Sequence, residues 1–210
     1  MQIVLGSSNP HKVKEINEII SDYFPLLEER GRVRCQDKTN ITFILPPEGF
    51  DPDETGTTFE ENSLIKAKAA WELSHTWALA DDSGLCIDAL DGKPGIFSAR
   101  YAETPQKRID RVLKELEGTE NRTAHFTCRM TLISPDGNVA LSCEGRCDGT
   151  IVKKQRGVNG FGYDPIFLIN GDTRTMAELS DEEKNRVSHR SKALKQVIEY
   201  LKENVLQSLL

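Results

Sequence analysis

The chain has 210 residues, 38% of them hydrophobic and 29% charged, which allows one large domain or two small lobes around one core and excludes a disordered chain. Its 27 basic and 33 acidic residues give a formal net charge of −6, which argues against a bulk nucleic-acid binder. A small anion in a local pocket is still compatible with that charge.

Two features concern the cellular compartment. The apolar N-terminus is too short for a secretory signal peptide, and no run approaches the ~18 apolar residues of a membrane span. The five cysteines are an odd number, and no pair has CxxC spacing, which favours a reduced setting. We therefore expect a cytoplasmic protein with no membrane partner.

The first predicted elements are a strand over residues 2–6 and a helix over about residues 11–20. Asn9 is placed to cap this helix, and Pro10 suits its first position. A strand that enters a helix through a short loop exposes backbone N–H groups that can bind an anion, and Lys12 lies in the same turn. A well-capped helix with a solvated lysine is the alternative.

Residues 28–50 predict an irregular excursion or an edge hairpin, which includes a strand over 41–45. Residues 51–62 carry five acids and no base. Such a run is either a solvated face or a loop that brings a carboxylate to a metal.

A largely apolar helix is predicted over residues 58–74, and we expect it to be buried. Asn62 and Lys66 are four residues apart, so they lie on one face of it. A lysine in such a helix either extends to solvent or pairs with an anion.

The densest chemical signal lies between two strands predicted over 78–81 and 85–88. Asp81 and Asp82 are adjacent at the end of the first strand, where ligands bind in α/β proteins, and a glycine turn is expected after them. Two adjacent acids repel each other, so a hard cation such as Mg²⁺ would explain them. An Asx-rich turn is the alternative.

A helix over 105–116 is followed by two long alternating stretches, 123–133 and 139–151, which predict a hairpin. Cys143 and Cys147 have the same parity, so they would share one face of the second strand.

Glycines surround Phe161 in the segment Asn159-Gly160-Phe161-Gly162-Tyr163-Asp164-Pro165. The backbone can therefore bend closely around a flat ligand, and Phe161 is a candidate to stack on a nucleobase. A tight turn with a core phenylalanine is the alternative.

Near the C-terminus, Ser180 and Glu183 form a capping-box pattern, and Ser188 is placed to cap a further helix. His189 and Arg190 would then lie at the start of that helix. Arg190 falls in register with an apolar stripe, so it needs a partner, and a guanidinium suits a carbonyl or phosphate oxygen. A basic helix terminus is the alternative.

Carboxylates for a metal, scattered lysines and arginines for phosphates, and a glycine-framed aromatic together indicate a nucleoside triphosphate. The sequence contains neither GxxxxGK[ST] nor GxGxxG, which disfavours a P-loop NTPase and a dinucleotide fold.

Six segments in series resemble the inosine triphosphate pyrophosphatase family, over residues 2 to about 201. Each motif is weak alone, whereas the series is specific. The segments are Ser7-x-Asn9-x-x-Lys12-x-x-Glu15, Glu54-Thr55-Gly56-x-Thr58-Phe59-x-Glu61-Asn62-x-x-x-Lys66, Ala80-Asp81-Asp82-Ser83-Gly84-Leu85, Pro94-Gly95-Ile96-Phe97-Ser98-Ala99-Arg100-Tyr101, Gly160-Phe161-Gly162-Tyr163-Asp164-Pro165 and Ser188-His189-Arg190.

The resemblance implies a single nucleoside-triphosphate pyrophosphatase domain over residues 1–210. Its fold would be α/β, an elongated mixed β-sheet flanked by helices, with two lobes and a central active-site cleft. The reaction would be Mg²⁺-dependent hydrolysis of ITP, dITP and XTP to the monophosphate and pyrophosphate. A homodimer is also implied.

The resemblance also assigns roles to residues. Asp82 would be the catalytic acid/base and a metal ligand, with Glu54 as a second ligand and Asp81 as a further candidate. Phe161 would stack on the purine, and His189 and Arg190 would contact its 6-keto group. The full implied substrate-binding set is Ser7, Ser8, Asn9, Pro10, His11, Lys12, Lys66, Ser83, Phe161, Gly162, Tyr163, Asp164, Lys184, His189 and Arg190.

Two other functions are weighed beside this one. The same scaffold could act on another substrate, such as a modified pyrimidine triphosphate. A module that senses nucleotides without turnover would keep the basic loop but lose the metal carboxylates, and the presence of Glu54, Asp81 and Asp82 counts against it.

Overall fold

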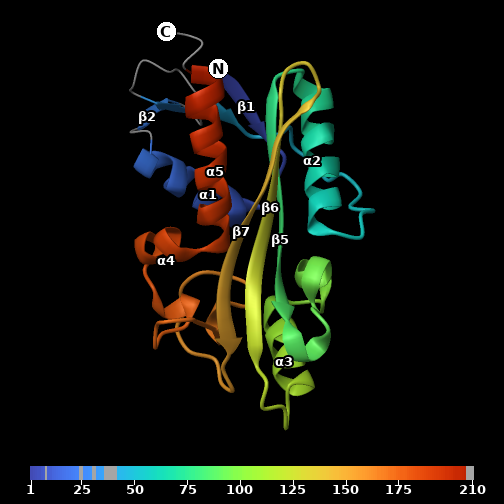
Figure 1. Ribbon diagram of the computed structural model, residues 1–210, viewed down its shortest axis with the longest axis vertical. Helices are drawn as coiled ribbons and strands as arrows, with labels where there is room; N and C mark the ends of the chain where they lie inside the picture. The colour runs from blue at the N-terminus through green and yellow to red at the C-terminus, as the bar shows by residue number, and fades with distance from the viewer. Residues whose placement is uncertain (8, 24–25, 30–31, 36–41, 207–210) are drawn as a thin grey trace. The chain divides into compact units, whose positions relative to one another are not determined.

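The computed structural model describes residues 1–7, 9–23, 26–29, 32–35 and 42–206 (Figure 1). Its strands and α-helices in chain order are β1 (Gln2–Leu5), α1 (Pro10–Tyr23), β2 (Leu26–Glu29), β3 (Arg32–Cys35), β4 (Thr42–Ile44), α2 (Phe59–Ser74), β5 (Trp77–Ile87), α3 (Pro105–Glu115), β6 (Thr123–Ile133), β7 (Val139–Ile151), β8 (Phe167–Ile169), α4 (Asp181–Val187) and α5 (His189–Leu201).

The strands form one mixed sheet in the order β2-β3-β4-β1-β5-β6-β7-β8. Strand β1 is parallel to both β4 and β5, whereas β2–β3, β3–β4 and β7–β8 are antiparallel. The mixed α/β sheet flanked by helices is therefore confirmed, and so are the edge hairpin (β2 and β3) and the strand predicted over 41–45.

The chain divides into two compact units, each with its own apolar core. The first unit comprises residues 1–82, 129–144 and 191–210, and the second comprises 83–128 and 145–190. Small side chains such as Ala67, Ala78 and Ala80 pack in the first core, and larger ones such as Phe167 pack in the second. The single domain over 1–210 and the cleft between two lobes stay predictions.

Helix α1 of the first unit begins as predicted. The Asn9 side-chain oxygen accepts from the backbone N–H groups of His11 at 3.0 Å and Lys12 at 3.4 Å, and Pro10 is the first helical residue. The cap uses two of the N–H groups that were expected to be available to an anion.

Helix α2 of the first unit begins with a capping box between Thr58 and Glu61. Its buried residues are Asn62, Ser63, Lys66, Ala67 and Ala70, whereas Leu73 is exposed. The helix is therefore buried along one face, which is less than its composition suggested. Figure 1 shows α2 on one face of the sheet and α1 on the other.

The two strands predicted over 78–81 and 85–88 are one strand, β5, so the prediction of a glycine turn between them is wrong. Gly84 has ordinary extended backbone, and residues on both faces of β5 are buried. The Leu85 N–H donates to Ser98 Oγ at 2.9 Å, which satisfies a backbone donor where a turn was expected. Asp81 and Asp82 therefore lie within a strand and point to opposite faces of it.

The other predicted elements are confirmed. Strands β6 and β7 are neighbours in the sheet, joined at Ser134 and Asn138 by a backbone hydrogen bond of 3.0 Å. Burial alternates along β7, and Cys143 and Cys147 both occupy buried positions of this pattern. Both are thiols. Helix α4 has the Ser180–Glu183 capping box and ends at Val187, and α5 begins at His189.

Candidate functional site

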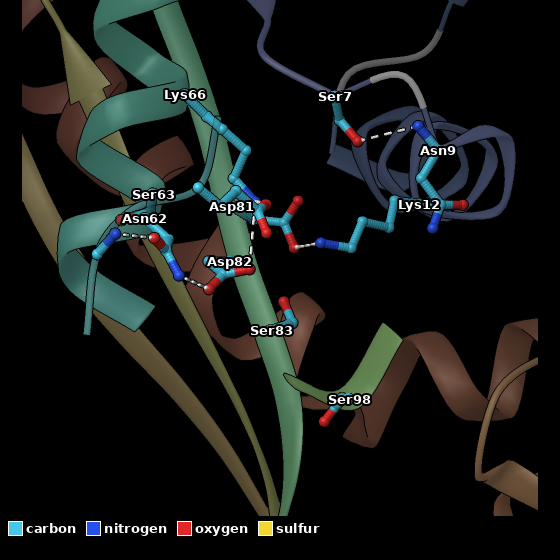
Figure 2. Close-up of polar contacts among 12 residues, drawn as sticks. Ser7, Asn9, Lys12, Asn62, Ser63, Lys66, Asp81, Asp82, Ser83 and Ser98 are labelled. Atoms are coloured by element: carbon cyan, nitrogen blue, oxygen red, sulfur yellow. Dashed lines mark hydrogen bonds and ion pairs between the residues drawn. The ribbon is translucent and has the colours of Figure 1, made fainter. Parts of the chain in front are cut away.

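Five charged side chains gather in the first unit, and we call them the carboxylate–lysine cluster. Its members are Lys12, Glu54, Lys66, Asp81 and Asp82. Figure 2 shows the two lysines and the two aspartates. They come from the first turn of α1, the loop before α2, the middle of α2 and the centre of β5. Three carboxylates against two ammonium groups leave one negative charge in excess.

Lys66 is the meeting point of two carboxylates. Its Nζ lies 2.6 Å from Glu54 Oε1 and 3.2 Å from Asp82 Oδ1. The Lys66 residue is only 8% exposed and Asp82 only 6%, so water screens this contact poorly. The sequence left open whether this lysine extends to solvent or pairs with an anion, and it pairs.

Asp81 belongs to a second ion pair on the other face of β5. Its Oδ2 lies 3.0 Å from Lys12 Nζ, and Asp81 is buried (Figure 2). The two adjacent acids thus reduce their repulsion by facing apart, each towards a lysine from a different helix.

Close backbone approach at Gly6 positions the start of the cluster. Gly6 follows β1, and its N–H donates to the Leu79 carbonyl at 2.8 Å. A Cβ at this position would lie 2.9 Å from both the Lys66 carbonyl oxygen and Ala80 Cβ, which is too close. Glycine therefore allows the chain to leave β1 beside α2 and β5 and to enter the loop before Lys12.

The loop residues predicted to bind phosphate are mostly exposed. Asn9, Pro10 and His11 are exposed, and the Asn9 N–H donates to Ser7 Oγ at 3.3 Å. Ser8 lies outside the described residues. The roles of these residues towards a substrate stay predictions.

Burial and charge act in opposite directions on the cluster's proton affinities. Burial raises the pKa of Asp82, and the nearby Lys66 and Lys12 offset this only in part. Burial alone would lower the pKa of Lys66, but the attraction of Asp82, Asp81 and Glu54 outweighs it and raises the pKa. Lys66 is thus held protonated, and Asp82 takes up a proton more readily than an exposed aspartate.

The donor set around Lys66 fits a hard cation. Among the described residues, no group of three or more His, Cys, Asp or Glu side chains could hold a metal alone. However, Mg²⁺ is usually held by one or two carboxylates, with waters and substrate phosphates completing its shell. Glu54 and Asp82 already converge on one positive charge, the Lys66 ammonium, and this is the arrangement such a cation needs.

The second unit contains the other predicted group, which we call the aromatic–basic group. Its members are Phe161, Asp164, Lys184, His189 and Arg190. Gly160 and Gly162 on either side of Phe161 both have positive φ, 72° and 64°, so the close bend predicted around this aromatic is present.

Asp164 organises the loop around Phe161. Its Oδ2 accepts from the Phe161 N–H at 2.9 Å and from Lys184 Nζ at 2.7 Å. The same ammonium lies 4.6 Å from the centre of the Phe161 ring, within cation–π distance. A Cβ at position 160 would lie 2.1 Å from Asp164 Oδ2, so glycine is required there as well.

His189 and Arg190 are both buried at the start of α5. The His189 ring stacks on Phe126, with centroids 4.8 Å apart and planes 12° apart. The Arg190 guanidinium reaches Ser83 Oγ at 3.4 Å and lies 5.8 Å from the Phe161 ring. Tyr163 is also buried and donates its hydroxyl to the Ser98 carbonyl at 2.9 Å.

Sequence reasoning missed several contacts, among them those of Phe126 and Asn62. Phe126 was one apolar position in an alternating strand, and nothing local connects it to His189. Asn62 was noted only for its spacing from Lys66, yet its Nδ2 donates to Asp82 Oδ2 at 3.2 Å (Figure 2). Its position one turn before a buried lysine was the available signal.

The fold and these two groups define an α/β protein with a buried acidic and basic cluster suited to a metal-bound anion. The Ham1 family model matches residues 3–200, and the chain belongs to this family. It is 42% identical over 197 residues to a dITP/XTP pyrophosphatase of Prochlorococcus marinus subsp. pastoris, a match that covers 94% of this chain and 95% of that protein.

Two solved structures are also similar. A HAM1 protein from Coxiella burnetii matches with a TM-score of 0.80 and 40% identity, covering 97% of this chain and 99% of that one. The Staphylococcus aureus Ham1 protein matches with a TM-score of 0.80 and 36% identity, covering 96% and 98%. The expected family is thus confirmed. In the described part of the chain, no helix is long and apolar enough to cross a membrane.

Proposed function

We propose that this protein hydrolyses the non-standard purine triphosphates ITP, dITP and XTP to the monophosphate and pyrophosphate. A water oxygen bonds to the α-phosphorus, the bond from that phosphorus to the α–β bridging oxygen breaks, and pyrophosphate leaves. Family membership and the names of the relatives support the substrate class. Removal of these compounds from the nucleotide pool is the expected role.

The observation that carries the proposal is the convergence of Glu54 and Asp82 on Lys66. Asp82 would accept the proton of the attacking water, and burial raises its pKa towards the range useful for a base. Lys66, Lys12 and the loop over 7–12 would bind phosphate oxygens, and the raised pKa of Lys66 keeps its ammonium charged for this task.

Glu54 and Asp82 would hold Mg²⁺, with Asp81 as a further candidate ligand. When bound, this ion neutralises developing charge on phosphate oxygens. The excess negative charge of the cluster favours its binding.

The aromatic–basic group would recognise the base. Phe161 would stack on the purine, with Gly162, Tyr163 and Asp164 shaping its surroundings and Lys184 adding positive charge. His189 and Arg190 would donate hydrogen bonds to the 6-keto oxygen, and Ser83 would touch the substrate. Adenine has an amino group at that position, and leaving a buried donor unpaired costs roughly 1–3 kcal/mol, or about ten- to a hundred-fold in preference.

Two further properties belong to this proposal. We expect a homodimer and a cytoplasmic location, as the family resemblance and the thiol state of the four described cysteines suggest.

The test is a panel of ITP, dITP, XTP, ATP, GTP and modified pyrimidine triphosphates with Mg²⁺, in which pyrophosphate and inorganic phosphate are measured separately. We expect pyrophosphate from the first three and little from ATP or GTP. Release of inorganic phosphate alone would refute the stated bond cleavage, and turnover confined to pyrimidines would refute the stated substrate.

A further inference from the structure

Asn62 connects the Asp82 carboxylate of the carboxylate–lysine cluster to the loop that carries Glu54. Its Nδ2 donates to Asp82 Oδ2 at 3.2 Å (Figure 2). Its Oδ1 accepts from the Gly56 N–H at 2.9 Å. The partners fix the amide orientation, because a carboxylate requires the NH₂ group and a backbone N–H requires the oxygen. Gly56 follows Glu54 by two residues, so the Asn62 side chain connects the Asp82 carboxylate to the backbone of the loop that carries Glu54.

Two observations show that this bridge is built into the local structure. Asn62 is completely buried, at 0% exposure, so both halves of its amide must be paired inside the protein. A Cβ at position 56 would lie 2.6 Å from Asn62 Oδ1, so the close approach requires glycine. Because it is fully buried, Asn62 has no surface with which to touch a substrate.

The bridge also fixes both oxygens of Asp82. Lys66 Nζ donates to Oδ1 and Asn62 Nδ2 donates to Oδ2, which sets the plane of the carboxylate. Hydrogen bonds to a metal-binding carboxylate orient it, and their loss typically costs 10–100-fold in metal affinity or activity.

We propose that Asn62 is a positioning residue, which holds Asp82 and the Glu54 loop in the relative geometry that a divalent cation requires. This inference rests on the proposed function for its activity readout, but not for its metal-binding readout.

The local bonds make the change Asn62→Ala informative. The loop keeps its other attachments to α2, because Glu61 Oε2 accepts from the N–H groups of Thr57 at 2.6 Å and Thr58 at 3.2 Å. The neighbouring Ser63 is a matched control: it is equally buried, and its hydroxyl bonds to Thr131 Oγ1 at 2.8 Å, away from the cluster.

We expect Asn62→Ala to weaken the binding of Mn²⁺, without nucleotide, by ten- to a hundred-fold. This is about the cost of losing a hydrogen bond that orients a metal-binding carboxylate. Electron paramagnetic resonance measures the binding. At saturating Mg²⁺, kcat for dITP should fall over the same range with KM nearly unchanged, as for an interaction that acts on the transition state. Ser63→Ala should keep both values close to wild type, although each variant lowers the melting temperature.

A second variant, Asn62→Leu, keeps a branched side chain of similar size and removes both hydrogen bonds, to Asp82 and to the Gly56 N–H. We expect it to fold and still lose at least about tenfold in kcat, since the hydrogen bond that orients Asp82 is lost. Wild-type kcat in this variant, or equal Mn²⁺ binding in Asn62→Ala and Ser63→Ala, would overturn the proposal. If the wild type releases no pyrophosphate but Asn62→Ala still weakens Mn²⁺ binding, the proposed function fails and the positioning role stands.

Discussion

Each unit contains a buried aspartate paired with a buried lysine, and the two pairs differ in what surrounds them. In the first unit, Lys66 Nζ lies 3.2 Å from Asp82 and 2.6 Å from Glu54. In the second, Lys184 Nζ lies 2.7 Å from Asp164, and the same oxygen accepts the Phe161 N–H. The residue types and the burial are nearly the same.

The difference lies in the charge balance. The Asp164 carboxylate is matched by an ammonium and a backbone donor, and these three groups fix the loop around an aromatic ring. The cluster around Lys66 keeps one negative charge in excess, which a divalent cation would compensate. The buried carboxylate–lysine pair of the second unit thus holds a loop, whereas that of the first unit is suited to bind a cation.

The largest expected effect is that of Asp82→Asn. Loss of the base should reduce pyrophosphate release from dITP by about 10²–10⁴-fold, the usual contribution of a general base. The melting temperature should stay equal or rise, because burial penalises the charged form of Asp82. A rate close to that of the wild type would remove Asp82 from the reaction.

The next effect compares the two lysines. Lys66→Met and Lys184→Met each leave buried carboxylates without an ammonium, so urea denaturation should show losses of about 3–5 kcal/mol in the free energy of unfolding. Relative to the wild type at the same Mg²⁺ concentration, the loss in Lys66→Met should become smaller, because Glu54 and Asp82 bind the ion more tightly without the competing ammonium. The loss in Lys184→Met should stay the same, because its Glu54–Asp82 site is that of the wild type. Equal recovery in both variants would contradict the contrast between the pairs.

Asp164→Asn should act on substrate binding. The change weakens the hold on Phe161 and Lys184, and a hydrogen bond to a charged group contributes about 1.5–3 kcal/mol, so KM for dITP should rise roughly ten- to a hundred-fold. The partly exposed pair of Asp172 and Arg174 supplies the control, since ion pairs in contact with water contribute little. If Asp172→Asn raises KM as much, Asp164 has no special role.

The smallest effect is a pH dependence of stability. The pKa of Asp82 is raised in the folded state, so its ionised form destabilises the fold at neutral pH. As the pH falls through the raised pKa towards the ordinary value of 3.8, protonation relieves this cost. The melting temperature of Asp82→Asn minus that of the wild type, measured in EDTA, should therefore shrink between pH 7 and pH 4. A difference that grows over this range would mean that the pKa of Asp82 is lowered.

Local patterns predicted most of the fold. The caps at Asn9 and Ser180 and the alternation of β6 and β7 depend on neighbours in sequence, so they are readable without tertiary information. The continuity of β5 could not be predicted in this way, because Gly84 in the sequence indicates a turn. In the structure, burial on both faces keeps the strand extended.

The site residues were readable to a similar extent. Asp82, Lys66 and Phe161 stand out by residue type and spacing. The pairing of Lys12 with Asp81 and the stacking of His189 on Phe126 join residues that are distant in sequence, so no local pattern shows them. That Asp81 and Asp82 point to opposite faces can be predicted only once it is known that β5 continues past them.

The close approach at Gly6 has a consequence for reading variants of this protein. Gly6 offers no functional group, yet any side chain there would press on the Lys66 carbonyl and on Ala80, one residue before Asp81. A saturation screen scored on nucleotide turnover would therefore rank Gly6 beside the charged residues. Such a score would resemble that of a residue in contact with the ligand, although its cause is steric: no side chain fits at this position.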